Sequence, residues 1–79
     1  MSIASHCLPI DVMSAGEHGI VAEVDGQSGF VARLQEMGLN RGAHVRMIKP
    51  GSPCILEVNH HRLSIRFDDS ATVLVDVHT

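Results

Sequence analysis

The sequence predicts a small, mainly β protein: one antiparallel sheet of about five strands, curled into a barrel, with one short helix after the first strand. Apolar and polar residues alternate in several short runs, and these runs are separated by residues that favour tight turns. A chain of 79 residues is also too short for two large packed sheets. Curling a single sheet buries its inner face and removes open edges, so a barrel is expected.

One short helix is expected in the stretch from Ser28 to Gly42, because both of its ends are marked. The Ser28 hydroxyl is suited to cap the N-terminus by accepting a hydrogen bond from a free backbone N–H. Helical spacing places four apolar residues on one face, namely Phe30, Val31, Leu34 and Met37. Gly38 can take the left-handed conformation that ends a helix, and Leu39 should then pack on Leu34 in a Schellman closure.

The strands are expected at Ile20–Val24, Ala43–Lys49, Cys54–Val58, Arg62–Phe67 and Thr72–Val77. Between them, Pro50–Pro53, Asn59–His60 and Asp68–Ser70 are expected to be turns, since Pro interrupts a ladder and Asn tolerates a positive φ. The expected core consists of Ile20, Val24, Leu34, Val45, Met47, Leu56, Val58, Leu63, Ile65, Val73 and Val75.

The whole chain, residues 1–79, is expected to form one domain. Residues 1–8 show no periodic pattern and are expected to be a loose N-terminal lead-in. Pro9–Met13 is expected to be an opening turn that covers the core.

Composition argues against several classes of function. Six basic and nine acidic residues give a net charge of −3, and a nucleic-acid-binding module normally has a basic footprint. The chain has two Phe and no Trp or Tyr, so it lacks the stacking platforms of single-strand binders and the aromatic grooves that bind proline-rich peptides. No signal peptide or membrane-spanning run is visible, and a cytoplasmic location with Cys7 and Cys54 as free thiols is expected.

Several segments together resemble a known family. Residues 33–45 read RLQEMGLNRGAHV, which is similar to the pattern RL-x-E-[LM]-G-[IL]-x-P-G-x-x-V of the FeoA family. Leu63–Arg66 resembles a second family segment, I-A-L-R, and Ser70, Val73 and Val75 align with A-x-x-I-x-V. The resemblance extends over about residues 8–77. FeoA proteins are small SH3-like domains of bacterial ferrous iron uptake systems.

The resemblance implies a small cytosolic accessory or regulatory protein with no resident cofactor. Its implied partner is the cytosolic GTPase-bearing part of a FeoB-type membrane transporter, so contact with a membrane would be indirect. Residues of the helix and its exit turn are candidates for the contact surface, and the candidates are Arg33, Glu36, Leu39, Asn40 and Arg41. Strand edges of an SH3-like barrel would also allow a homodimer.

Six histidines favour an alternative, a transition-metal sensor or metallochaperone. His18 and His44 lie near expected strand ends and could meet in space with Glu17, which suits ferrous iron. The adjacent pair His60–His61 chelates only if its turn kinks. A third class, an RNA-binding barrel, is disfavoured by the acidic balance.

An enzyme is not expected. No nucleophile elbow, phosphate loop or zinc-protease motif occurs in the sequence. Asp68–Asp69 are paired carboxylates, but they have no apparent third polar partner and are expected to be a solvated corner. Cys54 lies at an inward strand position and is expected to be a small buried hydrophobe.

Overall fold

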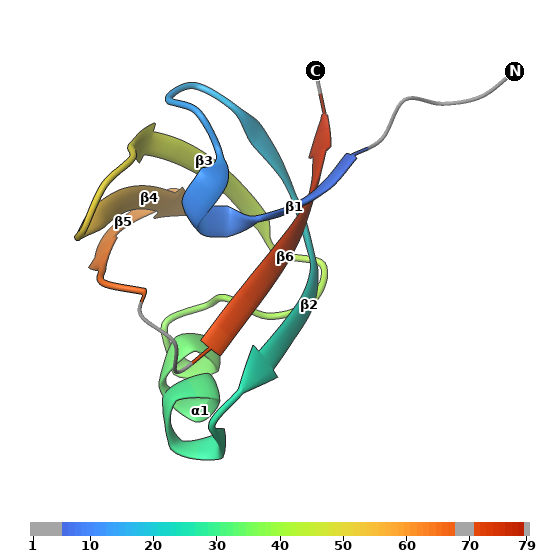
Figure 1. Ribbon diagram of the computed structural model, residues 1–79, viewed down its shortest axis with the longest axis vertical. Helices are drawn as coiled ribbons and strands as arrows, with labels where there is room; N and C mark the ends of the chain where they lie inside the picture. The colour runs from blue at the N-terminus through green and yellow to red at the C-terminus, as the bar shows by residue number, and fades with distance from the viewer. Residues whose placement is uncertain (1–5, 68–70, 79) are drawn as a thin grey trace, which may run out of the picture.

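The computed structural model describes residues 6–67 and 71–78. All six strands belong to one antiparallel sheet with the strand order β1-β6-β2-β3-β4-β5 (Figure 1). The elements in chain order are β1 (His6–Pro9), the 3₁₀ turn η1 (Ile10–Val12), β2 (His18–Gly26), α1 (Ser28–Glu36), β3 (His44–Lys49), β4 (Cys54–Val58), β5 (His61–Ile65) and β6 (Ala71–His78).

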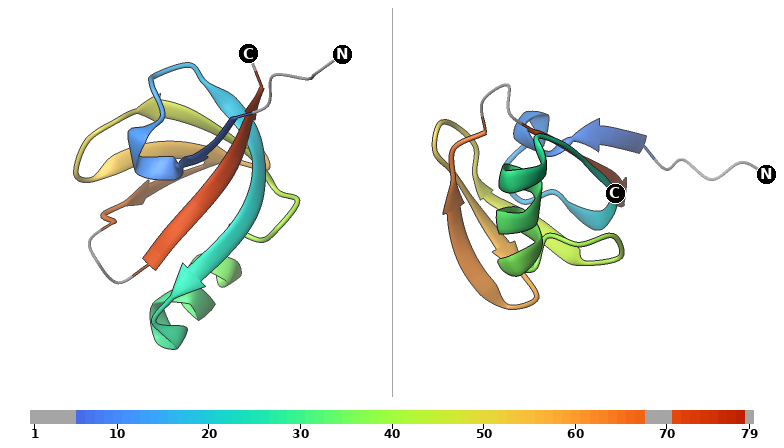
Figure 2. Two further views of the ribbon diagram at one scale, coloured as in Figure 1. Left: turned by 45° about the vertical axis from the view of Figure 1, so that its right-hand side comes forward. Right: turned by 90° about the horizontal axis from the view of Figure 1, so that it is seen from below.

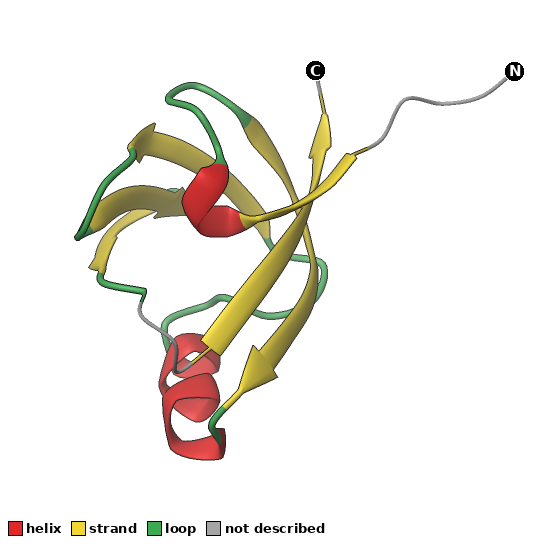
Figure 3. Ribbon diagram, viewed as in Figure 1, coloured by secondary structure: helices red, strands yellow, loops and turns green. Residues whose placement is uncertain are grey.

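The sheet curls strongly, and α1 lies across one end of it, next to the end of β2 and the start of β6 (Figures 1 and 2). Among the described residues, the loops are short and η1 is the second helical segment (Figure 3). This arrangement confirms the expected mainly β, SH3-like fold with one short helix.

Strand β1 was not expected from the sequence. Its four residues pair with β6, with Leu8 opposite Val75. The segment has no clear alternation and ends in Pro9, so its pattern alone does not predict a strand. Part of the expected lead-in is therefore a strand, while residues 1–5 of it lie outside the described residues. The sheet consequently has six strands, and α1 follows the second.

The inward face of β2 was assigned to the wrong residues. Val21 is buried, whereas Ile20 and Val24 are only half-buried. A register shift in the pairing with β6 falls between Val21 and Glu23, so the strict alternation used to assign the face is broken there. Ile20 is opposite His44 on the outer face, and Val24 packs against the margin of the core.

Most of the remaining expected core is confirmed. Leu63 is half-buried and packs against the core. The other expected residues are buried, namely Leu34, Val45, Met47, Leu56, Val58, Ile65, Val73 and Val75. The 3₁₀ turn covers the core as expected, because Ile10 and Met13 are each 1% exposed.

The structure contradicts the expected N-terminal cap of α1 and confirms its expected C-terminal closure. Ser28 is already the first helical residue, the N-cap is Gln27, and no side chain caps the helix there, so the expected Ser28 cap is wrong. The expected C-terminal closure is confirmed. Gly38 has φ +104° and its N–H donates to the Gln35 carbonyl at 3.0 Å, while the Leu39 N–H donates to the Leu34 carbonyl at 2.9 Å. These are the two bonds of a Schellman motif.

The turns agree with the sequence where they can be compared. Asn59 and His60 have φ of 50° and 72°, and they connect β4 to β5 as a two-residue hairpin. Pro50–Pro53 connects β3 to β4. The expected turn Asp68–Ser70 lies outside the described residues.

Candidate functional site

The end of α1 and its exit turn form one exposed polar surface. Arg33, Glu36, Asn40 and Arg41 are all exposed, and we call these four residues the helix-end surface. The Asn40 side-chain amide donates to the Gln35 carbonyl at 3.2 Å, which fastens the turn to the last turn of the helix. Together with the Schellman bonds, this contact holds the surface in one backbone conformation.

Leu39 does not belong to this surface. Its exposed fraction is 0%, because the closure that reverses the chain also turns its side chain into the core beside Leu34. The inclusion of Leu39 among residues that contact a partner is therefore wrong; its role is to anchor the turn. Met37, which was expected on the same face of the helix as Leu34, is 41% exposed. It adds an apolar side chain next to the helix-end surface.

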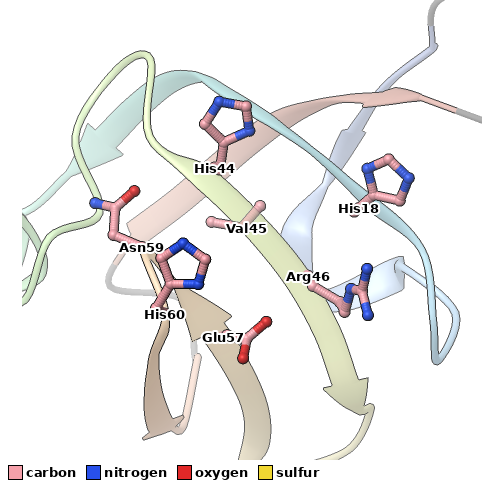
Figure 4. A pocket seen from close by; sticks show the side chains of 7 residues that line it. All are labelled: His18, His44, Val45, Arg46, Glu57, Asn59 and His60. Atoms are coloured by element: carbon pink, nitrogen blue, oxygen red, sulfur yellow. The ribbon is translucent and has the colours of Figure 1, made fainter.

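His18 and His44 lie on one face of the sheet, as the metal hypothesis requires. His18 is opposite Arg46 and His44 is opposite Ile20, so the two histidines occupy neighbouring strands two positions apart. Both side chains are exposed. They border a shallow hollow of about 400 Å³, whose full lining is His18, His44, Val45, Arg46, Glu57, Asn59 and His60 (Figure 4).

The hollow differs from the expected metal site in its third member. Glu17 does not line it, and the Glu17 carboxylate accepts a hydrogen bond from the Ser14 backbone N–H at 2.6 Å. His60 lines the hollow instead, because the tight turn after β4 carries its ring to the neighbourhood of His44 (Figure 4). Sequence reasoning placed His60 in a turn but could not tell which strand that turn would approach.

The hollow as it stands is not a formed metal centre. Within residues 6–67 and 71–78, no group of three or more His, Cys, Asp or Glu side chains is arranged to hold a metal ion. Arg46 also lies directly opposite His18, and a guanidinium next to a ligand disfavours a bound cation. The lining groups therefore offer hydrogen bonds rather than a closed coordination shell.

Both described thiols are free, and they differ in access. Cys7 is exposed on β1, whereas Cys54 is buried on β4, as expected for a small hydrophobe. Burial raises the pKa of the Cys54 thiol above its ordinary value. Neither thiol lines the hollow or the helix-end surface.

No polar or charged residue is buried among the part of the chain that the structure describes. Asp76 is half-buried, and its Oδ1 atom is buried without a hydrogen-bond partner among the described residues. No helix in the described ranges is long and apolar enough to cross a membrane. The protein is thus a small SH3-like domain, and its two candidate sites, the helix-end surface and the hollow beside His44, are both on its exterior.

The chain belongs to the FeoA family, because the model of the FeoA domain matches residues 8–77. The family links it to ferrous iron transport. No curated protein is similar enough in sequence to count as a match.

Solved structures agree with this assignment. The crystal structure of an iron uptake regulatory protein (FeoA) is 27% identical, with a TM-score of 0.85, and the alignment covers 92% of this chain and 100% of that one. Stenotrophomonas maltophilia FeoA, crystallised with zinc, is 25% identical with a TM-score of 0.76, covering 87% and 89%. It is described as an SH3 domain protein and a candidate ferrous iron transport activating factor. The solution structure of Chlorobium tepidum FeoA is 26% identical with a TM-score of 0.72, covering 86% and 70%.

Proposed function

We propose that this chain is a cytosolic accessory protein of ferrous iron uptake, and that it regulates a FeoB-type transporter by binding the transporter's GTPase-bearing cytosolic part. The observation that carries the proposal is the match to the FeoA domain over residues 8–77, together with the SH3-like fold. A small domain with exposed polar surfaces and no buried polar residue among those described can act through its shape and charge.

The helix-end surface is the proposed contact. Arg33 and Arg41 supply cations, Glu36 supplies an anion, and Met37 supplies an exposed apolar side chain. The Schellman closure fixes the backbone of this turn before a partner arrives. A rigid surface loses little conformational entropy on binding, so a small patch of this kind can still give measurable affinity.

Titration calorimetry of this protein with the soluble cytosolic part of the transporter tests the proposal. We expect saturable binding, and we expect Arg33→Glu with Arg41→Glu to weaken it by roughly tenfold or more, because opposite charges across the contact become like charges. Arg46→Glu with Lys49→Glu changes the net charge equally, on β3 and away from the helix-end surface, and should leave binding near that of the unmodified protein. Absence of a signal at low and moderate salt, with and without nucleotide, would overturn the proposal.

A transition-metal sensor or metallochaperone is the second candidate. His18, His44 and His60 line one hollow, and the related protein from S. maltophilia has been crystallised with zinc. Imidazole nitrogens suit both Fe(II) and Zn(II). Anaerobic calorimetry with Fe(II), and with Zn(II) as a comparison, should then show binding that His18→Ala with His44→Ala removes. Unchanged affinity in this double variant would exclude these two ligands.

A further inference from the structure

We propose that the free edge of β5 binds an extended segment of a partner protein in which acidic and apolar residues alternate. The segment would add to the sheet as a further strand, and its backbone would pair with that of β5. This surface is separate from the helix-end surface, and the inference does not depend on which protein supplies the segment.

The first argument is the position of β5 in the sheet. It is the last strand in the sheet order, and among the described residues it pairs with β4 alone. The two-residue turn at Asn59–His60 makes the flanking pair, Val58 and His61, a hydrogen-bonded pair. Alternation along an antiparallel ladder then directs the backbone groups of Arg62 and Ser64 away from β4. These N–H and C=O groups are available to another strand.

The second argument is the chemistry on the two faces of this edge. Arg62 and Ser64 are exposed on the outer face, and Arg66 follows directly after the strand and is also exposed. On the inner face, Leu63 and Phe67 are half-buried and pack against the margin of the core. Side chains of an added strand alternate between faces. If every second residue of the segment places a carboxylate beside the arginines, the residues between them face Leu63 and Phe67. Apolar residues are favoured at those positions of the segment.

The third argument is the distribution of charge along the chain. Residues 44–66 contain four basic residues, Arg46, Lys49, Arg62 and Arg66, and one acidic residue, Glu57, which gives +3. The whole chain has a net charge of −3, so the other residues sum to −6. Residues 44–66 thus carry net positive charge in an acidic protein, with Glu57 opposite Arg62 on β4 and with Asp68 and Asp69 next after Phe67 in the sequence. Opposite charges across paired strands stabilise the pairing, which favours an acidic segment.

Charge also argues against a second copy of this chain as the occupant. Pairing two β5 edges would bring together the Arg62 and Arg66 side chains of both copies, and charged residues on an edge deter this kind of association. The opposite edge of the sheet is β1, which is only four residues long and ends in Pro9, a residue without an N–H. The β5 edge is therefore the better site for strand addition.

A nuclear magnetic resonance titration of the isotope-labelled protein tests the inference. The probe is an end-capped eight-residue peptide in which glutamate and valine alternate. We expect its addition to shift the amide signals of residues 61–67 most strongly, with an effect that falls as salt rises. A peptide of the same composition, with the four glutamates in one block, should bind roughly fivefold more weakly, because each of its faces then carries both glutamates and valines and neither face matches the edge along its length.

Three variants separate binding at the edge from general electrostatic attraction. Arg62→Glu with Arg66→Glu should weaken binding of the alternating peptide by roughly tenfold or more, whereas Arg46→Glu with Lys49→Glu, an equal change of charge on β3, should weaken it by about twofold or less. Ser64→Pro removes an N–H that points away from β4, a change that edge strands tolerate, and it should abolish binding while the protein stays folded.

Equal binding of the alternating and block peptides would overturn the inference, as would shifts centred outside residues 61–67. Equal loss of binding in the two double variants would also overturn it. Sedimentation that shows self-association through β5, blocked by Ser64→Pro, would replace the acidic segment with a second copy. Peptide binding without transporter binding would leave this inference intact and overturn the proposed function instead.

Discussion

The backbone conformation of Gly38 is the single-residue feature that closes α1. Its φ of +104° is strained for any residue with a Cβ. We expect Gly38→Ala to lower the free energy of unfolding by about 1–2 kcal/mol. The added Cβ would meet a Val58 methyl group at 3.5 Å, an ordinary contact, so the loss would come from the backbone rather than from crowding.

Urea unfolding measures this loss, and Gly29→Ala is the matched control. Gly29 lies in α1, has no positive φ, and has open space around its missing Cβ. Alanine restricts the unfolded chain at such a position, so the control should gain about 0.4–1 kcal/mol. A Gly38→Ala variant as stable as the Gly29→Ala variant would mean that the left-handed residue does not carry the closure.

The buried thiol of Cys54 predicts how stability depends on alkaline pH. Burial raises its pKa in the folded protein, so above about pH 8.5, the ordinary thiol value, the unfolded chain releases the proton while the folded protein keeps it. The unfolded state then binds fewer protons, and the free energy of unfolding falls as pH rises. Cys54→Ala should flatten this slope in urea unfolding between pH 7.5 and about 10. Cys7→Ser, a change at an exposed thiol, should retain it.

At the scale of elements, the β4–β5 hairpin is held in register by two residues with positive φ. His60 has φ 72°, a conformation that glycine adopts without the cost that a side chain adds. Because Asn-Gly is the preferred pair for a turn of this kind, His60→Gly should raise the free energy of unfolding by about 0.5–1 kcal/mol. Thermal unfolding measures the effect, and His61→Gly, one residue later in β5, should instead destabilise the hairpin by a similar amount.

The elements show where sequence reasoning succeeds and where it fails. β4 alternates strictly, and β3 does so as far as Met47, before its own register shift, so Val45, Met47 and Leu56 were assigned to the core correctly. In β2 the same reasoning assigned Ile20 instead of Val21, because a bulge is set by pairing with a distant strand and leaves no local mark. β1 is too short to show a period, and its pairing with β6 is a long-range contact that no local pattern reveals.

For the candidate surfaces too, sequence reasoning succeeded where the local pattern decides exposure and failed where long-range pairing decides it. Arg33 and Arg41 were predictable as exposed, since the helix pattern and the glycine closure place them outside. Leu39 is part of the Schellman closure and is buried. The sequence predicted that closure, and packing of Leu39 on Leu34 was reason enough to leave Leu39 out of the contact surface. His60 enters the hollow through the pairing of β3 with β4, which brings the turn after β4 toward His44. Only the folded topology shows that proximity.

At the scale of the whole molecule, the described elements pack on one small hydrophobic core. A large cavity in that core should therefore remove much of the free energy of unfolding. Leu34 is 0% exposed and joins α1 to the sheet. We expect Leu34→Ala to cost about 2–5 kcal/mol, while a domain of this size has a total stability of about 4–12 kcal/mol. The variant should be partly unfolded near 37 °C by circular dichroism. Leu34→Met keeps the volume and should lose less than about 1.5 kcal/mol.

The placement of β6 has a consequence for how the protein is made. Of the six described strands, β6 is synthesised last, yet it lies between β1 and β2, which are synthesised first (Figure 1). Until that moment β1 has no neighbour, and the apolar side of β2 has no cover from Val73, Val75 and Val77. A chain that stops before residue 71 therefore cannot complete this sheet, whatever the strength of its other strands.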